Sequence, residues 1–292
     1  MLLLVIPAQA APLRVTLLLT DKNATYHEFA ASFASEAARQ KYSLSINQTN
    51  VLPQNTDLIV AVGLKSAAMA LNSRIPVLNV LVSKAGFERL LHELPPQHEK
   101  GVFSAIYLDQ PSKRQIDLIS AALPEAKKIG LLFSAESTNI TGLRKAIAEA
   151  RLTLNEQAME SAESLYRDLH SLLQRSDVLL AVPDMQIYNA STMRNILLET
   201  YRSGIPVVGF SPAYVRAGAL CAVFSTPEQI ATQAAFQIIQ FAETGHLPAP
   251  QYPSEFEVVV NQQVARSLGL QIKDTASLSR QIKAAATAVE GK

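Results

Sequence analysis

Residues 177–207, which read DVLLAVPDMQIYNASTMRNILLETYRSGIPV, decide the fold. The run from Leu179 to Val182 is apolar at every position, as is typical of a strand that is covered on both faces. A polar turn and an amphipathic segment follow, and Gly204 ends that segment before a second apolar run begins at Val207. This order of strand, turn, helix and strand predicts one unit of a parallel sheet with a helix packed on it.

The same alternation extends along almost the whole chain. The predicted strands are Arg14–Leu19, Leu58–Val62, Val77–Leu81, Val102–Tyr107, Ile129–Phe133, Val178–Val182, Val207–Phe210 and Leu220–Phe224. The predicted helices include Tyr26–Lys41, Lys65–Leu71, Ser112–Leu123, Gly142–Arg151, Leu165–Gln174, Thr192–Tyr201 and Gln229–Thr244. Strands that alternate with helices predict an α/β fold in which helices flank parallel sheets. The segment Asp57–Pro76 repeats the order found at residues 177–207, which indicates two lobes of similar topology.

The composition agrees with a two-lobed globular protein. A chain of 292 residues is longer than one compact core usually is. The net charge is only +1, and the balance of charges indicates neither a nucleic-acid partner nor binding to a lipid surface. Cys221 is the one cysteine, which excludes an intramolecular disulfide and a paired-cysteine metal site. Its apolar neighbours predict a buried, unreactive thiol.

The first residues resemble the end of a signal peptide. An apolar run, Leu2–Ile6, is followed by Ala8-Gln9-Ala10, a small-residue pattern that predicts cleavage after Ala10. The apolar run is short and no basic residue precedes it, so a first strand with a frayed end is the alternative. On the first interpretation residues 1–10 are a partial signal peptide and the mature protein is periplasmic.

Sequence motifs of enzymes are absent. The sequence has no Gly-x-Gly fingerprint for a dinucleotide, no His-Glu-x-x-His metal motif and no nucleophile elbow. His92 and His98 fall in a proline-broken segment that predicts a surface loop rather than a metal site. We therefore expect no catalytic residues, no metal and no cofactor. A dispersed catalytic set on a doubly wound fold, as in a hydrolase or transferase, is the alternative.

Polar residues gather instead at the predicted carboxyl ends of the strands, which is where open α/β sheets bind ligands. The candidate ligand-binding residues there are Asp21, Asn23, Gly63, Ser66, Ser134, Ser137, Thr138, Asn139, Asp184 and Ser211, together with the rings of Tyr107, Tyr188, Phe210 and Tyr214. We expect Ser137, Thr138 and Asn139 to hold an anionic group at a helix start. Asp184 or Asp21 would meet an amino group, and the rings of Tyr107, Tyr188 and Phe210 would line the apolar part of the cleft.

Several segments are similar to those of one known family. They are Asp109-Gln110-Pro111, Leu123–Leu132 (LPEAKKIGLL), Gly204–Gly209 (GIPVVG) followed by Val215–Leu220 (VRAGAL), and Val258–Asn261 (VVVN). In order and spacing, from about Leu13 to Ile272, the chain resembles the ABC-transporter substrate-binding family typified by tryptophan and tyrosine binders. Residues 183–188 and 224–228 differ from the corresponding turns of the aromatic-amino-acid binders.

The resemblance implies a two-lobed type I periplasmic-binding fold with three hinge crossovers. Lobe 1 would comprise residues 11–103 and 225–254, and lobe 2 residues 104–224 and 255–292. The implied function is that of the periplasmic solute-binding component of an ABC importer. It would act as a monomer, bind a small organic solute such as an amino acid or related carboxylate between the lobes, and deliver it to a permease in the inner membrane. An extracytoplasmic sensor of the same fold is the alternative.

Overall fold

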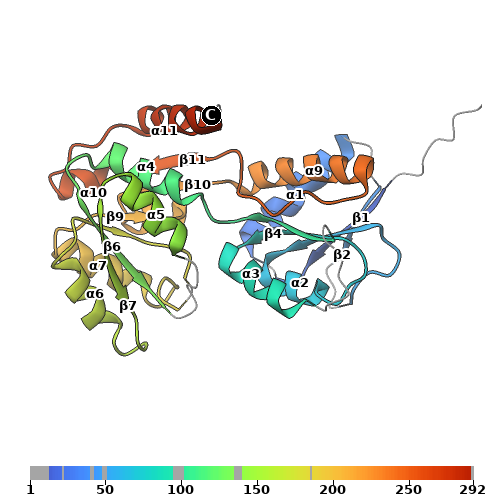
Figure 1. Cartoon of the computed structure of the whole chain (residues 1–292), viewed down its shortest axis with the longest axis horizontal. Helices are drawn as coiled ribbons and strands as arrows, with labels where there is room; N and C mark the ends of the chain where they lie inside the picture. Colours follow the sequence, from blue (N-terminus) through green and yellow to red (C-terminus); the bar gives the residue numbers. More distant parts are fainter. Residues whose placement is uncertain are drawn as a thin grey trace, which may run out of the picture. The chain divides into compact units, whose positions relative to one another are not determined.

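The computed structural model describes residues 13–21, 23–39, 43–47, 51–94, 102–134, 140–184 and 186–290 (Figure 1). The expected signal peptide, residues 1–10, lies outside them. The chain divides into two compact units. The first comprises Met1–Val82, Gly86–Tyr107 and Pro227–Gln251, and the second comprises Ser83–Ala85, Leu108–Thr226 and Tyr252–Lys292. The lobe boundaries expected from the sequence remain a prediction.

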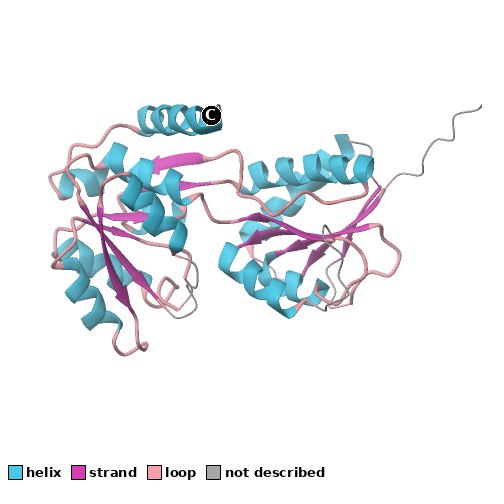
Figure 2. Ribbon diagram, in the orientation of Figure 1, coloured by secondary structure: helices cyan, strands magenta, loops and turns pink. Residues whose placement is uncertain are grey.

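The first unit is a parallel sheet with the strand order β2-β1-β3-β4-β5. Its strands are β1 (Arg14–Leu19), β2 (Ser43–Asn47), β3 (Leu58–Val62), β4 (Val77–Val82) and β5 (Phe103–Tyr107). Its helices are α1 (Ala24–Arg39), α2 (Gly63–Ala70), α3 (Lys84–Glu93, of which the first two residues belong to the second unit) and α9 (Pro227–Thr244). Helices α1 and α9 cover one face of the sheet, and α2 and α3 cover the other (Figures 1 and 2).

The core of the first unit explains the apolar strands. All five residues of β3 are buried, because helices cover both faces of this central strand. On one face, Phe29 and Phe33 of α1 stack with 5.7 Å between ring centroids and pack with Ala234 and Ile238 of α9. These contacts join the last helix of the unit to the first, although the second unit lies between them in the sequence.

The second unit has a six-stranded sheet in the order β11-β10-β9-β8-β6-β7. Its strands are β6 (Lys128–Phe133), β7 (Thr153–Ala158), β8 (Val178–Leu180), β9 (Val207–Gly209), β10 (Cys221–Phe224) and β11 (Glu257–Val260), and only the β10–β11 pair is antiparallel. Its helices are α4 (Ser112–Ala122), α5 (Thr141–Glu149), α6 (Leu165–Leu173), α7 (Met193–Arg202), α8 (Pro212–Ala217), α10 (Gln262–Ser267) and α11 (Thr275–Glu290). One apolar core joins the sheet to α4, α5, α10 and α11, and another joins it to α6, α7 and α8.

The predicted α/β architecture is confirmed, and each predicted strand and helix overlaps an observed one. Three strands were missed, β2, β7 and β11, which lie at the edges of their sheets. The residues of β7 are half-exposed or exposed, so its sequence, TLNEQA, carries no continuous apolar run. His92 was wrongly placed in a loop, because it lies in the last turn of α3, whereas His98 is outside the described residues. Cys221 is free and buried as predicted, and burial raises the pKa of its thiol to about 12.

Candidate functional site

In the first unit, the carboxyl end of β1 meets the start of α2. The Thr20 backbone N–H donates to the Ser66 hydroxyl at 3.2 Å, and the two hydroxyl oxygens lie 3.0 Å apart. Beside them the Lys65 ammonium lies 3.4 Å from the Asp21 carboxylate, and both side chains are exposed. The structure therefore brings Asp21 and Ser66 to one edge of the sheet. The Ser66 hydroxyl is used to join β1 to α2.

Two further predicted residues shape this edge. Asn23 accepts a hydrogen bond from the Tyr26 backbone N–H at 2.9 Å and so caps the first turn of α1. Gly63 begins α2 with a φ of +77°, and a Cβ atom placed on it would lie 2.2 Å from the Tyr26 hydroxyl oxygen. The Tyr26 ring therefore occupies the space above the start of α2. Burial, with a smaller effect from Asp21, raises the pKa of Tyr26.

Tyr107, at the end of β5, belongs to the core of the first unit. Its side chain is 7% exposed and meets the Phe87 ring edge-on at 5.9 Å between centroids. Its backbone N–H donates to the Gln251 carbonyl at 3.0 Å. Phe87 of α3 thus packs against the Tyr107 ring that was predicted to contact a ligand. Contact between Tyr107 and a ligand remains a prediction.

In the second unit, Asp184 joins the ends of two strands. One carboxylate oxygen accepts from the Ser134 backbone N–H at 2.9 Å, and the other accepts from the Gln186 backbone N–H at 3.0 Å. Asp184 and Ser134 are both buried. The carboxylate thus ties the carboxyl end of β6 to the turn that follows β8. Its expected pairing with an amino group of the ligand remains a prediction.

Three predicted rings form one cluster beside this turn. Tyr188 meets Phe210 and Tyr214 edge-on at 6.2 and 6.1 Å, and Phe210 and Tyr214 lie 4.6 Å apart. The hydroxyls of Tyr188 and Tyr214 are buried and have no hydrogen-bond partner among the described residues. Burial raises the pKa of both phenols. Ser211 begins α8, where its hydroxyl accepts from the Tyr214 backbone N–H at 3.4 Å.

The predicted anion site lies outside the described residues, because residues 135–139 include Ser137, Thr138 and Asn139. Asn189 lies among the described residues, in the turn ahead of α7. Its side-chain oxygen accepts from the backbone N–H groups of Ser191 and Thr192 at 2.9 and 3.2 Å, ahead of α7.

A cavity of about 80 Å³ lies in the second unit at the carboxyl end of β8. Its lining residues are Lys84, Ala85, Asp109, Gln110, Ser112, Gln115, Ile140, Leu143, Val182, Pro183 and Tyr252. All of them belong to the second unit, and none was a predicted ligand-binding residue. Two sequence signals point near it: the segment Asp109-Gln110-Pro111, which carried part of the family resemblance, and the end of the apolar run at Val182.

A set of hydrogen bonds holds one wall of the cavity in place. The Gln110 amide nitrogen donates to the Ser225 hydroxyl at 2.9 Å, and its amide oxygen accepts from the Arg114 guanidinium at 2.7 Å. Gln115 in turn donates to the Gln110 carbonyl at 2.9 Å. Because these amides are buried or half-buried and already bonded, they act as a rigid frame around the cavity.

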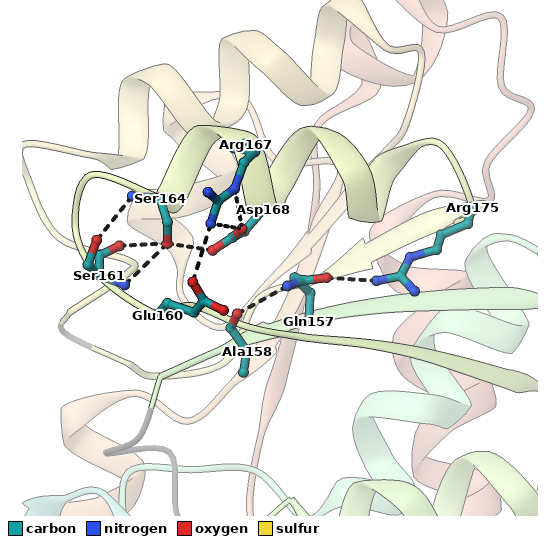
Figure 3. Close-up of polar contacts among 8 residues, drawn as sticks. All are labelled: Gln157, Ala158, Glu160, Ser161, Ser164, Arg167, Asp168 and Arg175. Carbon is teal, nitrogen blue, oxygen red and sulfur yellow. Dashed lines mark hydrogen bonds and ion pairs between the residues drawn. The ribbon is translucent and has the colours of Figure 1, made fainter.

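A second polar cluster lies at the carboxyl end of β7 (Figure 3). The buried Asp168 carboxylate accepts from the Ser164 hydroxyl at 2.5 Å and from the Arg167 guanidinium at 3.2 Å. The Ser164 hydrogen bond is the main cause that lowers the pKa of Asp168, followed by the contacts from Arg167. Ser161 and Ser164 exchange hydrogen bonds between hydroxyl and backbone ahead of α6. These hydrogen bonds hold together the loop that connects β7 to α6.

Neither a metal-ligand cluster nor a membrane-spanning helix occurs in the described part of the chain. No group of three or more His, Cys, Asp or Glu side chains is arranged there to hold a metal ion. None of the helices described is both long and apolar enough to cross a membrane.

A family model of ABC transporter substrate-binding proteins matches residues 22–283. The chain belongs to this family. Its members bind solutes, are not enzymes and act outside the cytoplasm. A tyrosine-binding protein of Clostridioides difficile is 24% identical over 227 residues, which are 74% of this chain and 64% of that protein. The chain thus spans less than two thirds of the length of this curated relative.

Two solved structures support the fold of this family member. One, from Streptococcus pneumoniae, is an ABC domain in complex with L-Trp; it is 17% identical, with a TM-score of 0.69, and the match covers 92% of this chain and 98% of that one. The other, from Clostridium difficile, is the ligand-free, open structure of a substrate-binding protein with adhesive properties. It is 18% identical with a TM-score of 0.70, over 89% and 96% of the two chains. The fold is therefore that of the two-lobed periplasmic binding proteins.

Proposed function

We propose that this protein is the periplasmic solute-binding component of an ABC importer, and that it binds a small organic solute such as an amino acid or related carboxylate. The observation that carries the proposal is the cavity at the carboxyl end of a parallel sheet in a chain of the substrate-binding family. Ligands of open α/β sheets bind at this end of the strands. The tyrosine-binding relative supports an amino acid as one member of the solute class.

The chemistry of the strand ends supports binding rather than catalysis. The Asp184 carboxylate is engaged by two backbone N–H groups, and the Ser66 hydroxyl is engaged by Thr20. A general base or nucleophile needs an oxygen that can reach a substrate, whereas these oxygens hold neighbouring strands and helices together. We therefore propose that the protein has no catalytic activity.

The location and the partners belong to the same proposal. Residues 1–10 would direct export, the mature protein would act in the periplasm as a monomer, and a permease in the inner membrane would receive the solute. Members of the family act outside the cytoplasm, which supports the proposed location.

The test is native mass spectrometry of the full chain, freshly purified from its periplasm, followed by thermal unfolding with the solute that is found. We expect a bound small molecule whose addition to stripped protein raises the melting temperature in a concentration-dependent way. If neither a retained solute nor a panel of amino acids, organic acids and sugars shifts the melting temperature, the proposal is wrong. If the bound solute is recovered unchanged after prolonged incubation, catalysis is also excluded.

A further inference from the structure

The outer face of α7 in the second unit exposes apolar side chains between two arginines. Leu198 and Tyr201 are 44% and 52% exposed, although both side chains are large and apolar. Arg194 and Arg202 are exposed toward the two ends of the helix. At 3.6 residues per turn these four residues fall within about 100° of one another around the helix axis, so they share one face. The buried residues of α7 lie outside this sector.

The two arginines are unpaired within the described part of the chain. No ion pair or hydrogen bond joins either guanidinium group to another described residue. The one acidic residue of α7 is Glu199, and its carboxylate is engaged at the side of the helix that faces α6, 3.0 Å from His170 Nδ1. The outer face of α7 therefore carries two positive charges that the helix itself does not balance.

Neighbouring helices extend this face on both sides. Helix α6 lies beside α7 (Figure 1), and the Tyr166 hydroxyl accepts from Asn195 Nδ2 at 3.0 Å, so an exposed ring is held next to the first turn of α7. On the other side α8 packs near Leu197, whose Cδ1 atom would lie 3.9 Å from a Cβ placed on Gly218, and α8 carries the exposed Arg216. We call the following residues the α7 surface: Arg194, Leu198, Tyr201 and Arg202, with Tyr166 at their edge.

The carboxylates that precede α6 are engaged within their own loop. Glu160 lies 3.5 Å from the Arg167 guanidinium, and a hydrogen bond from Ser161 is the main cause that lowers the pKa of Glu163. These contacts leave the arginines of the α7 surface without a carboxylate partner.

The chemistry of the α7 surface fits an acidic protein surface. An exposed cluster of apolar side chains marks an interaction site. Arg and Tyr are also the residue types that often dominate the binding energy at the centre of a protein interface. A guanidinium group binds a carboxylate through two parallel hydrogen bonds. A partner with carboxylates on either side of an apolar recess therefore complements Arg194, Arg202 and the side chains between them.

Two other occupants fit this surface less well. Segments that bind anionic lipids usually carry about four to eight basic residues, whereas the α7 surface has two. A second copy of this chain, paired through the same face about a two-fold axis, would bring the arginines of both copies together without a carboxylate between them.

We propose that the α7 surface docks on an acidic surface of the permease that receives the solute. Arg194 and Arg202 bind carboxylates of the permease, and Leu198 and Tyr201 fill an apolar recess between those carboxylates. The docking surface rests on the proposed function and names the chemistry by which the chain recognises its protein partner.

Photo-cross-linking in cells tests this docking. The full chain carries p-benzoylphenylalanine in place of Tyr201, and mass spectrometry identifies the peptides that become linked to it. We expect links to a permease, within a segment rich in Asp and Glu. The matched control carries the same probe in place of Phe236, an exposed aromatic residue of α9 in the first unit, and should not link to that segment.

Charge reversal measures what the arginines contribute. Binding of the purified full chain to the linked permease, held in lipid nanodiscs, is followed by biolayer interferometry. Arg194→Glu combined with Arg202→Glu should weaken binding about tenfold or more, and replacement of the linked permease carboxylates with Lys should restore it. Tyr201→Ala should also weaken binding about tenfold.

A matched double variant separates contact from overall charge. Arg74→Glu combined with Arg266→Glu changes the net charge by the same amount at exposed positions elsewhere, and it should weaken binding less than about threefold. All variants should keep the native melting temperature and its rise on addition of solute, because the replaced side chains are exposed.

Four results would overturn the inference: links only to lipid, links only to a second copy or to a protein other than a permease, no link above that of the Phe236 control, or unchanged binding by the double variant of Arg194 and Arg202. If solute still raises the melting temperature in any of these cases, the inference falls and solute binding stands. Failure of the proposed function is seen separately, as the absence of a rise in melting temperature with every solute.

Discussion

The Asp184 carboxylate accepts the backbone N–H of Ser134 at 2.9 Å, in a buried contact that joins the ends of β6 and β8. The two residues are fifty positions apart in the sequence. A buried backbone N–H must find an acceptor, so this contact keeps two strand ends in register at the edge of the sheet where ligands bind.

Replacing Asp184 with Asn should destabilise the second unit. An amide offers one acceptor oxygen in place of two, so one of the N–H groups of Ser134 and Gln186 faces an NH₂ group. We expect a loss of about 1–3 kcal/mol in the free energy of unfolding, measured by urea denaturation. Asp117→Asn is the matched control, because Asp117 forms an exposed helical ion pair with Lys113 that contributes about 0.3–0.5 kcal/mol. Equal losses in the two variants would contradict the structural role of Asp184.

Gly63→Ala should be costly in the first unit for two separate reasons. The φ of +77° strains any residue with a Cβ, and that Cβ would also collide with Tyr26. Gly245 has a φ of +73° and nothing within 4 Å of its would-be Cβ, so Gly245→Ala reports the backbone strain alone, about 1 kcal/mol. We expect Gly63→Ala to lose clearly more stability than Gly245→Ala. When Gly63→Ala is combined with Tyr26→Ala, most of its additional loss of stability relative to Gly245→Ala should disappear. If that additional loss persists, contact between the new Cβ and Tyr26 is not its cause.

The phenol hydroxyls of Tyr188 and Tyr214 should contribute little or nothing to stability. Both are buried and unpartnered among the described residues, and a buried hydroxyl without a partner is unfavourable. Tyr188→Phe and Tyr214→Phe are therefore expected to leave the free energy of unfolding unchanged or to raise it by up to about 1 kcal/mol. Tyr188→Ala should lose about 3–5 kcal/mol, because the ring itself fills the cluster with Phe210 and Tyr214. A loss of more than 1 kcal/mol in either Phe variant would reveal a hydrogen-bond partner such as a buried water.

Asp168 should make the second unit sensitive to acid. The hydrogen bond from the Ser164 hydroxyl is the largest of the causes that hold the pKa of Asp168 below its ordinary value. A pKa lowered by folding stabilises the protein fully above the unfolded-state pKa, and this stabilisation is lost as the pH falls through the folded-state value. Ser164→Ala should thus cost about 1–2 kcal/mol at pH 7 and progressively less below pH 4, measured by urea unfolding across this range. Ser267→Ala, which removes a hydroxyl bonded to the Gln263 carbonyl, should show a pH-independent effect; the same behaviour in Ser164→Ala would refute the coupling.

The central strands could be predicted from the sequence because their surroundings impose an apolar residue at each position. Strand β3, Leu58–Val62, is buried on both faces and was predicted with its observed bounds. Strand β7 was missed because its residues Asn155, Glu156 and Gln157 are half-exposed. A strand whose side chains are only partly covered leaves no continuous apolar run to detect.

The candidate site was predicted only in outline. The carboxyl ends of parallel strands meet at one edge of a sheet, so the sequence was enough to bring Asp21 near Ser66 and Ser134 near Asp184. The residues that line the cavity were missed because they come from five separate segments of the chain. Lys84, Ser112 and Tyr252 follow different elements, and only the folding of the second unit brings them together.

The sequence by itself determined the alternation of strands and helices, the burial of Cys221 and the family, because each depends on local composition or on the order of segments. Only the tertiary structure decided which polar groups remain available to a ligand. By residue type alone, a ligand could be bound by Asp184, Ser66 or Gln110. In the structure, the side-chain oxygen or amide of each is hydrogen-bonded to another part of the chain. The reason is physical: a hydrogen-bond partner that lies tens of residues away is chosen by packing in space, and no local pattern records it.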